Sequence, residues 1–344
     1  MNLSLAQALA SRPNDHRTVR ARFEEQTATG WHTPTPANLA AGCAVSVVIP
    51  ARDSAHSLRP VLDAVASQDT HGSVEVIVVD DASTDATADI AQGHPAVDVL
   101  VRLPQPGGAA AARNAGTALA QTDTVVYLDA DMVLPTHALA DFGARARPDT
   151  VLIGFRHNVP YRPGPHRSAQ VPSGEADLAA DHRVTWRSQG GKQLYTGTFL
   201  DGPTTGSPLN STDDFQGLGH GATYLDWDLP RTCVTALMAA PRAAVIDVGG
   251  FDPAFGYIGW GMEDTHLGAA LIAAGCLVVP LRQCVGFHLD PPDAADQWER
   301  KLAGWPATLA HYQKLLTQPA PSGREAHFLD STTQLLSTAG VVTR

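Results

Sequence analysis

The sequence predicts an α/β fold in which a mostly parallel sheet carries helices on both faces. Over residues 44–131, valine-rich runs alternate with segments of helical apolar spacing, and each strand–helix pair takes about thirty residues. Three predicted strands end in polar clusters, at Arg52-Asp53, Asp80-Asp81 and Asp129-Asp131. Because the carboxyl ends of parallel strands share one edge of a sheet, we expect these clusters to converge where open α/β folds bind ligands.

The first part of the chain contains four predicted strands, each a short run rich in valine, at 45–49, 74–79, 97–103 and 125–128. Three helices lie between them. The first has apolar residues at Leu58, Val61, Leu62 and Val65, the second follows a cap at Ser83 or Thr84, and the third is the alanine-rich segment 109–120 after a glycine turn. Two short helical pieces, 3–10 and 19–23, precede the first strand, and two prolines at 34 and 36 end that pattern.

The middle of the chain is irregular. Residues 157–230 are rich in Pro, Gly, His and Asp, and we expect short strands and turns that form one wall of a cleft. Four scattered histidines there are interpreted as surface or acceptor-site residues: His157, His166, His182 and His220. Further predicted elements are a strand at 233–238, a helix at 242–248 and a helix from Glu263, followed by apolar segments at 277–280 and 285–290. The rest is predicted to form an amphipathic helix at 298–316 with a kink or break at Pro306, a linker at 317–324 and a terminal helix at 325–344.

Composition limits the possible partners. The net charge is −11 and no basic run is present, which argues against nucleic acid or an anionic membrane as the main partner. No apolar run approaches the roughly 18 residues that span a bilayer, and the N-terminus lacks a secretory apolar region, so we expect a cytoplasmic protein without a transmembrane segment. The four cysteines lack Cys-x-x-Cys spacing, which favours buried thiols over disulfides: Cys43, Cys233, Cys276 and Cys284.

Asp129-Ala130-Asp131 is the first candidate site. Two carboxylates at the end of a buried strand repel each other unless a cation or hydrogen-bond donors lie between them. Hard oxygen ligands suit Mg²⁺ or Mn²⁺, which commonly bridge carboxylates to a substrate diphosphate, although an isolated Asp-x-Asp also occurs as a solvated turn. His288 follows a short apolar run and is a further candidate ligand, because Mn²⁺ accepts an imidazole; a lone histidine is more often structural.

Glu263 and Asp264 form the second candidate site. They lie in the first turn of a predicted helix, where the helix dipole favours acids, so good helix chemistry alone could explain them. The preceding Trp260 lies between two glycines. Glycines allow close approach of the backbone, and an indole offers a flat face to a sugar ring.

Two common nucleotide-binding patterns are absent from the sequence. The first strand is followed by Pro50-Ala51-Arg52-Asp53 instead of Gly-x-Gly-x-x-Gly, which argues against a nicotinamide dehydrogenase. Gly107-Gly108 lacks the Lys-Ser/Thr that completes a P-loop, and we interpret it as a loop hinge.

Five segments, in this order, resemble the GT-A glycosyltransferases of family 2: 45–53, Asp80-Asp81, 111–116, 129–131 and 259–264. The last matches the branch with a C-terminal Gly-Trp-Gly-x-Glu-Asp, galactosyltransferase-like motif, and the resemblance spans about residues 44–290. It implies a Rossmann-like, mixed, mostly parallel GT-A sheet. It also implies an inverting, Mn²⁺- or Mg²⁺-dependent transfer of a sugar, from a nucleotide-sugar such as a UDP-sugar, to a hydroxyl or thiol of a natural product, peptide or glycan.

The resemblance also implies roles for individual residues. Asp264 would be the catalytic base, and the metal would bind Asp129, Asp131 and His288. The nucleotide-sugar would contact Pro50, Ala51, Arg52, Asp53, Asp81, Arg113, Asp129 and Ala130, with Asp81 accepting from the uracil N3–H. The acceptor would contact Trp260, Gly261, Met262 and Glu263. Arg52 and Met262 depart from the family pattern, which has an aromatic residue and a second glycine at these positions.

This interpretation divides the chain into four parts. Residues 1–43 form an N-terminal extension, 44–156 the nucleotide-sugar-binding half, 157–290 the acceptor-binding and catalytic half of the same domain, and 291–344 a C-terminal helical segment.

One alternative function is that of a sugar-1-phosphate nucleotidylyltransferase, which would need a glycine-rich, basic loop after the first strand. The other is a non-catalytic domain that binds sugar or protein, against which the retained Asp129, Asp131 and Asp264 argue.

Overall fold

The computed structural model describes residues 3–12, 14–70, 72–165, 168–181 and 228–344. Its strands are β1 (Ala44–Ala51), β2 (Ser73–Asp80), β3 (Val99–Arg102), β4 (Thr124–Leu128), β5 (Met132–Val133), β6 (Thr150–Val159), β7 (Leu237–Pro241), β8 (Leu277–Leu289) and β9 (Gly340–Thr343). Its α-helices are α1 (Leu5–Ala10), α2 (Arg17–Thr27), α3 (Ala37–Ala40), α4 (Leu58–Ala66), α5 (Thr87–Gly93), α6 (Gly108–Leu119), α7 (Ala138–Arg145), α9 (Asp228–Thr232), α10 (Arg242–Asp247), α11 (Phe255–Ile258), α12 (Glu263–Ala273), α13 (Ala294–Leu316) and α14 (Glu325–Ser337). A short 3₁₀ helix covers Leu178–Ala180.

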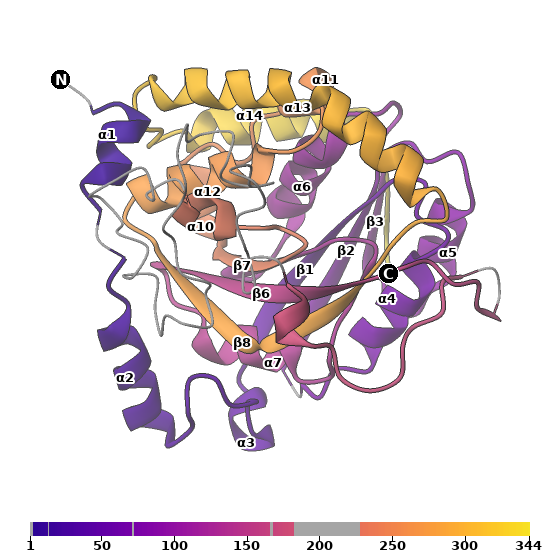
Figure 1. Cartoon of the computed structure of the whole chain (residues 1–344), viewed down its shortest axis with the longest axis horizontal. Coiled ribbons are helices and arrows are strands. Elements are labelled where there is room, and N and C mark those ends of the chain that lie inside the picture. The colour runs from indigo at the N-terminus through magenta and orange to yellow at the C-terminus, as the bar shows by residue number, and fades with distance from the viewer. Residues whose placement is uncertain (1–2, 13, 71, 166–167, 182–227) are drawn as a thin grey trace, which may run out of the picture.

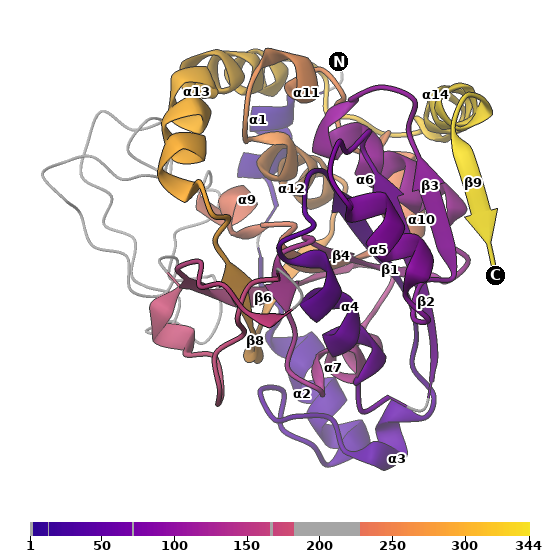
Figure 2. The ribbon, with the colours of Figure 1, turned by 90° about the vertical axis from the view of Figure 1, so that its right-hand side faces the viewer.

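The described strands form one sheet in the order β5-β8-β6-β7-β4-β1-β2-β3-β9 (Figure 1). Strands β1 to β4 are parallel to one another, and β6 is parallel to β8. The reversed strand β7 joins the two groups by antiparallel pairing with β4 and β6, and β5 and β9 pair antiparallel at the two edges. Figure 2 shows β9 beside β3 at one edge. The predicted mixed, mostly parallel sheet is therefore confirmed.

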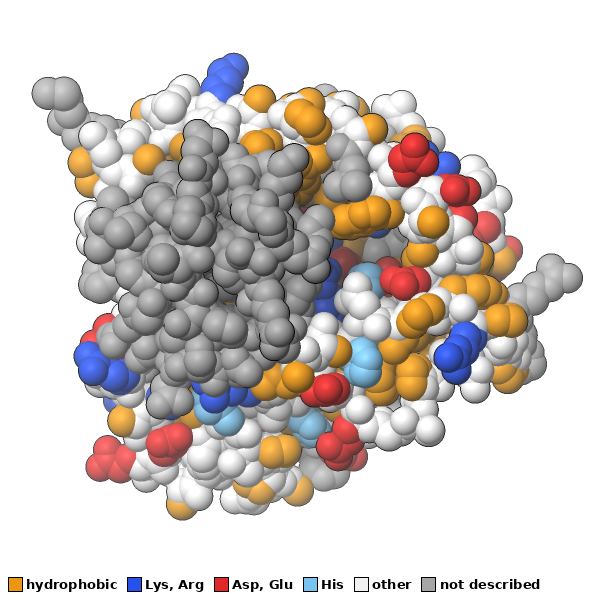
Figure 3. Space-filling model, viewed as in Figure 1, with side chains coloured by type: hydrophobic (Ala, Val, Ile, Leu, Met, Phe, Trp, Pro, Cys, Tyr) orange, Lys and Arg blue, Asp and Glu red, His pale blue; other side chains and the backbone are white. Residues whose placement is uncertain are grey.

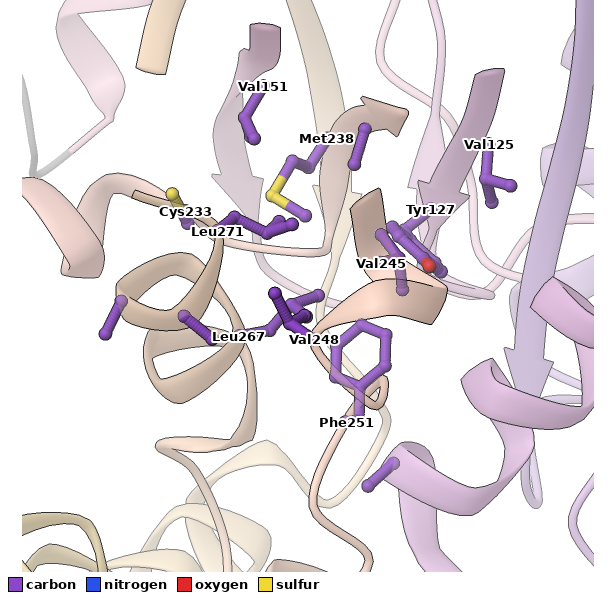
Figure 4. Close-up of a cluster of buried hydrophobic side chains, with 14 of the residues drawn as sticks. Val125, Tyr127, Val151, Cys233, Met238, Val245, Val248, Phe251, Leu267 and Leu271 are labelled. Atoms are coloured by element: carbon purple, nitrogen blue, oxygen red, sulfur yellow. The ribbon is translucent and has the colours of Figure 1, made fainter. Parts of the chain in front are cut away.

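Side-chain alternation along the strands gives the sheet a hydrophobic core on each face. In β4, Val125 and Tyr127 face the cluster under α6, α10 and α12, whereas Val126 and Leu128 face the cluster under α4 and α7. Figure 4 shows part of the first cluster. There the ring of Tyr127 meets that of Phe251 edge-on, with centroids 5.1 Å apart.

Several predicted boundaries were wrong in the second part of the chain. The strand expected at 233–238 lies at Leu237–Pro241. The apolar segments that begin at Leu277 and Val285 belong to the single strand β8. Pro306 does not break α13, which continues through it. The helix expected to the chain end stops at Ser337, because Gly340 begins the edge strand β9.

Two further expectations changed. Ser83 and Thr84 do not cap α5, which follows Ala86; instead the Thr84 amide and hydroxyl donate to Asp53. The linker expected at 317–324 pairs with the N-terminal segment, since the Leu5 amide donates to the Gln318 carbonyl oxygen at 2.8 Å. Most of the irregular 157–230 segment, including His166, His182 and His220, lies outside the described residues.

The N-terminal extension packs onto the domain through Arg145. The Trp31 indole N–H donates to the Pro280 carbonyl oxygen at 3.0 Å. The fully buried Arg145 guanidinium donates to the carbonyl oxygens of Trp31, Thr33 and Gly30, and pairs with Asp141 at 3.2 Å. A buried charge is tolerated only when it is satisfied in this way, so the extension completes the solvation of Arg145.

Arg145→Met should destabilise the protein by about 3–5 kcal/mol, because it leaves the buried Asp141 carboxylate without its cation. Urea unfolding followed by circular dichroism measures the change. The exposed Arg59→Met on α4 is the matched control and should differ from wild type by less than about 0.5 kcal/mol. Equal unfolding midpoints for the two variants would contradict the role assigned to Arg145.

The four cysteines match the expectation of buried thiols. All four cysteines are buried and form no disulfide. No helix in the described ranges is long and apolar enough to cross a membrane.

Candidate active site

A pocket of about 450 Å³ opens at the carboxyl edge of β1 and β4. Figure 3 shows the hollow on this face, with acidic, basic and histidine side chains inside it. The pocket is lined by residues from widely separated parts of the chain: Pro50, Ala51, Arg52, Ser54, Asp81, Gly108, Ala109, Ala112, Arg113, Asp129, Ala130, Asp131, Arg156, Arg231, Val234, Thr235, Ala236, Trp260, Gly261, Met262, Glu263, Asp264, Thr265, Lys301 and Trp305. The predicted convergence of the strand ends is therefore confirmed for Arg52, Asp81, Asp129 and Asp131.

Strand pairing brings His288 to Asp131. β5 follows Asp131 and pairs with β8, so that Met132 lies opposite His288. The Leu289 amide donates to the Asp131 carbonyl oxygen at 2.9 Å, which fixes the two segments. Asp129, Asp131 and His288 consequently have potential ligand atoms within 4.8 Å of one another, and His288 Nε2 lies 3.3 Å from Asp131 Oδ1.

This cluster fits a divalent cation. Asp131 Oδ1 and His288 Nδ1 are buried and have no hydrogen-bond partner among the residues that the structure describes. Burial raises the pKa of Asp131, and its electrostatic interactions with His288 and Lys301 oppose the rise. Two carboxylates and one imidazole are a donor set that Mn²⁺ accepts, whereas Mg²⁺ prefers oxygen ligands alone.

A second group of possible ligands, His137, Asp141 and Cys284, is structural. Asp141 already accepts from His137, Thr35 and Arg145. Burial, followed by the negative charge of Asp141, raises the pKa of the Cys284 thiol well above its usual value. A metal there would have to displace the Arg145 guanidinium, so this network stabilises the fold instead.

Arg113 joins the two candidate sites. It lies on α6, is buried, and its guanidinium is 2.8 Å from Asp129 and 3.3 Å from Glu263. One cation thus contacts an acid of the metal cluster and an acid of the Glu263-Asp264 pair. The neighbouring Asn114 fixes the same region, since its side-chain amide exchanges two 2.8 Å hydrogen bonds with the Phe251 backbone.

Asp264 is a carboxyl group whose pKa is raised close to 7. It lies in the first turn of α12, and its Oδ1 accepts from the Thr265 amide at 2.7 Å. Burial, followed by the negative charge of Glu263, raises the pKa of Asp264 to about 7, although the charge of Arg113 opposes the rise. A carboxylate with this pKa can accept a proton at physiological pH.

The loop before α12 has an unusual backbone. Gly261 and Met262 have φ values of 88° and 73°, two successive left-handed residues. Position 262 therefore favours glycine, and the methionine there costs about 1–2 kcal/mol of backbone strain. Met262 is also buried, so its side chain offsets part of that cost by packing.

Helix α13 holds this loop from outside. A Cβ at Gly259 would lie 2.9 Å from the Gly304 carbonyl oxygen, so the two backbones touch. The Thr308 hydroxyl donates to the Trp260 carbonyl oxygen at 3.1 Å. The position of the Trp260–Asp264 segment consequently depends on α13.

At the other end of the pocket, Asp81 accepts two backbone amides. Its Oδ1 accepts from Gly107 at 2.6 Å and its Oδ2 from Gly108 at 3.0 Å. Arg52 approaches Asp81 at 3.8 Å while remaining half exposed. Asp81 therefore anchors the α6 N-terminus, and its oxygens retain lone pairs for a ligand.

Most of the predicted site residues share this pocket. Two do not line it: Asp53, which accepts a hydrogen bond from the Thr84 amide, and His288, whose Nε2 lies 3.3 Å from Asp131 Oδ1. Lys301 and Trp305 line it and were not predicted. Their spacing by four residues on a predicted helix was the available signal, but it does not say which helix face meets the pocket.

Asp264→Asn should stabilise the metal-free protein at pH 8 by about 1–2 kcal/mol, less than the full pKa shift because solvent reaches the pocket. The folded pKa lies near 7 and the unfolded value near about 3.9, so the wild type loses stability as pH rises through that window. The gain should vanish at pH 4. Urea unfolding at both pH values measures it, with Asp89→Asn as the control for loss of an exposed carboxylate; a gain equal at both values would refute the raised pKa.

Residues 46–195 match the family model described as glycosyl transferase family 2. The chain is 28% identical over 258 residues to a validoxylamine A glucosyltransferase of Streptomyces hygroscopicus subsp. jinggangensis, covering 71% of this chain and 55% of that protein. It is 26% identical over 285 residues to a chondroitin synthase of Pasteurella multocida, covering 77% of this chain and 26% of that protein.

Among solved structures, the fold is similar to the mannosyltransferase PcManGT of Pyrobaculum calidifontis, solved in complex with GDP-Man and Mn²⁺. The TM-score is 0.51 at 19% identity, over 97% of this chain and 85% of that chain. At this identity the likeness shows the fold alone. The chain spans 55% and 26% of the two curated relatives named above.

Proposed function

We propose that the chain, whose residues 46–195 match the model of glycosyl transferase family 2, is an inverting, metal-dependent glycosyltransferase. It moves a sugar from a nucleotide-sugar, with UDP as the preferred carrier, to a hydroxyl or thiol of a natural product, peptide or glycan. The observation that carries the proposal is one pocket lined by Asp264 and by Asp129 and Asp131, the two carboxylates of the Asp129-Asp131-His288 cluster. Four buried thiols outside any disulfide support a reducing, cytoplasmic setting.

Asp264 is the proposed general base. As the acceptor hydroxyl attacks the anomeric carbon, its proton passes to the Asp264 carboxylate, and the sugar–phosphate bond breaks on the opposite side. A single in-line displacement inverts the anomeric centre. The near-neutral pKa of Asp264 supports this role, because the group is available to accept a proton and basic enough to hold it.

The metal cluster is the proposed site of leaving-group stabilisation. Asp129, Asp131 and His288 would hold Mn²⁺ or Mg²⁺, which as a Lewis acid neutralises charge that develops on the departing diphosphate. Arg113 orients Asp129 and Glu263 by its two ion pairs. Pro50, Ala51 and Asp81 would contact the nucleoside, and Trp260 and Met262 the acceptor.

A thermal-shift panel of nucleotide-sugars with and without Mn²⁺ tests the proposal. A bound donor at about 100 times its Kd should add about 2.7 kcal/mol of stability, and only when Mn²⁺ is present. Incubation with the best donor should then release a nucleoside diphosphate. Pyrophosphate exchange would instead indicate a nucleotidylyltransferase, and the absence of any nucleotide-dependent shift would indicate a non-catalytic domain.

Arg113→Met should lower kcat/KM by about 10²-fold, since Asp129 and Glu263 lose the charge that positions them. Removing the positive charge also raises the pKa of Asp264, so the acid limb of the kcat profile should move to higher pH. Arg113→Lys retains the charge and should leave that limb closer to its wild-type position. An unmoved limb in Arg113→Met would contradict the coupling.

A further inference from the structure

Two side chains on one face of α13, Lys301 and Trp305, line the pocket, and Trp298 lies on the same face of the helix. Trp298, Lys301 and Trp305 are spaced by three and four residues, which places them on the same side of the helix. Trp298 and Trp305 flank Trp260, with ring centroids 5.7 and 5.9 Å away. Trp260, Lys301 and Trp305 line the pocket itself and form one wall of it.

These indoles are incompletely buried. Trp260 and Trp305 are partly exposed toward the pocket, and Trp298 is 39% exposed beside it. Large aromatic faces left accessible around a cavity are typical of ligand sites, and indole faces pack well against the C–H face of a sugar ring. The wall is therefore available to a ligand with such a face.

Lys301 adds a positive charge to this wall. Its Nζ lies 5.3 Å from the Trp260 ring centroid, and it makes no ion pair or hydrogen bond with a described residue. Its charge also acts on Asp131 across the pocket. An ammonium held among indoles attracts an anion and repels a cation brought to the same place.

We propose that the pocket wall formed by Trp260, Lys301 and Trp305 selects an acceptor that presents a saccharide-like ring to the indoles and a negatively charged group to Lys301. The inference rests on the proposed function in assigning this end of the pocket to the acceptor. It adds a substrate class, an acidic sugar or a similar ring acid, and it names Lys301 as the specificity-determining residue. The lysine lies beside Trp260, on the side of the catalytic loop, which favours the acceptor over the donor diphosphate as the source of the anion.

Binding of monosaccharide probes, followed by tryptophan fluorescence, tests this without requiring turnover. Glucuronate, glucose and glucosamine share a ring and differ in charge, and we expect affinity to fall in that order. Lys301→Met should weaken glucuronate binding by about tenfold and leave glucose unchanged. Lys301→Arg should restore most of the loss, and Lys314→Met, an exposed lysine of the same helix, should bind like wild type. Trp305→Leu should weaken glucuronate and glucose equally while retaining a cooperative thermal transition.

Titration with UDP and Mn²⁺ on the same variants separates the two possible sources of the anion. Unchanged UDP affinity in Lys301→Met, together with the loss of glucuronate, supports the acceptor assignment. Weakened UDP with unchanged glucuronate would place the lysine at the donor and overturn it. Failure of the wild type to bind glucuronate more tightly than glucosamine would also overturn it. If UDP does not bind at all, the proposed function fails, whereas the monosaccharide order still tests the wall.

Discussion

Asp264→Asn should lower the rate of sugar transfer by roughly 10²–10⁴-fold while nucleotide binding stays at its wild-type strength. Asparagine fills the same space and keeps an acceptor for the Thr265 amide, but it cannot take a proton from the acceptor substrate. The measurement is initial-rate kinetics with a saturating donor, combined with a UDP titration. Asp89→Asn, an exposed change of the same kind, is the control.

The pH profile of the wild type adds a second readout of the same residue. Because Asp264 must be ionised to act as a base, kcat should rise as pH increases toward about 7 and then level off. The residual activity of Asp264→Asn should lose this limb. A variant that turns over normally, or retains the limb, would show that another group accepts the proton.

Asp131→Asn should abolish metal-stimulated transfer, with a loss of roughly 10²–10³-fold, since metal stabilisation of the leaving group is worth several kcal/mol and each 1.36 kcal/mol is tenfold. The mutation removes a carboxylate whose Oδ1 is buried and accepts no hydrogen bond from the described part of the chain. Activity measured against Mn²⁺ concentration, after EDTA treatment, shows whether affinity or maximal rate is lost.

The matched control for Asp131 is His288→Gln, which removes the third member of the cluster and leaves both carboxylates. It should raise the Mn²⁺ concentration needed for half activity and leave more of the maximal rate than Asp131→Asn does. Full activity of Asp131→Asn in EDTA would exclude the metal role of the cluster.

The first half of the fold could be predicted because its signals are local. Buried parallel strands give valine-rich runs, and α4 repeats its apolar residues at helical spacing, so β1, β2 and α4 lie within two residues of the predicted positions. β6 and α7 were not predicted, although the sheet continues through β6. The boundary of β7 depends on its pairing with β4, a tertiary contact that no short sequence window contains.

The candidate site likewise has residues that could be identified from the sequence and contacts that could not. Asp129, Asp131, Glu263 and Asp264 could be identified because acids at strand and helix ends are visible in the sequence. The ion pairs of Arg113 with Asp129 and Glu263 join residues 16 and 150 positions apart and become apparent only when α6 is placed. The roles of these residues remain predictions, to be tested by the variants above.

The contact of Gly304 with Gly259 makes helix α13 an adjustable support for the loop that precedes Asp264. With no side chain at either position, even one methyl group at Gly304 would lie 3.2 Å from the Gly259 Cα and act as a spacer. Such a change would tilt the Trp260 platform relative to Asp264 without altering any group that touches the substrate. Evolution or engineering could therefore change the acceptor preference from outside the pocket, by changing the distance between the backbones at positions 259 and 304.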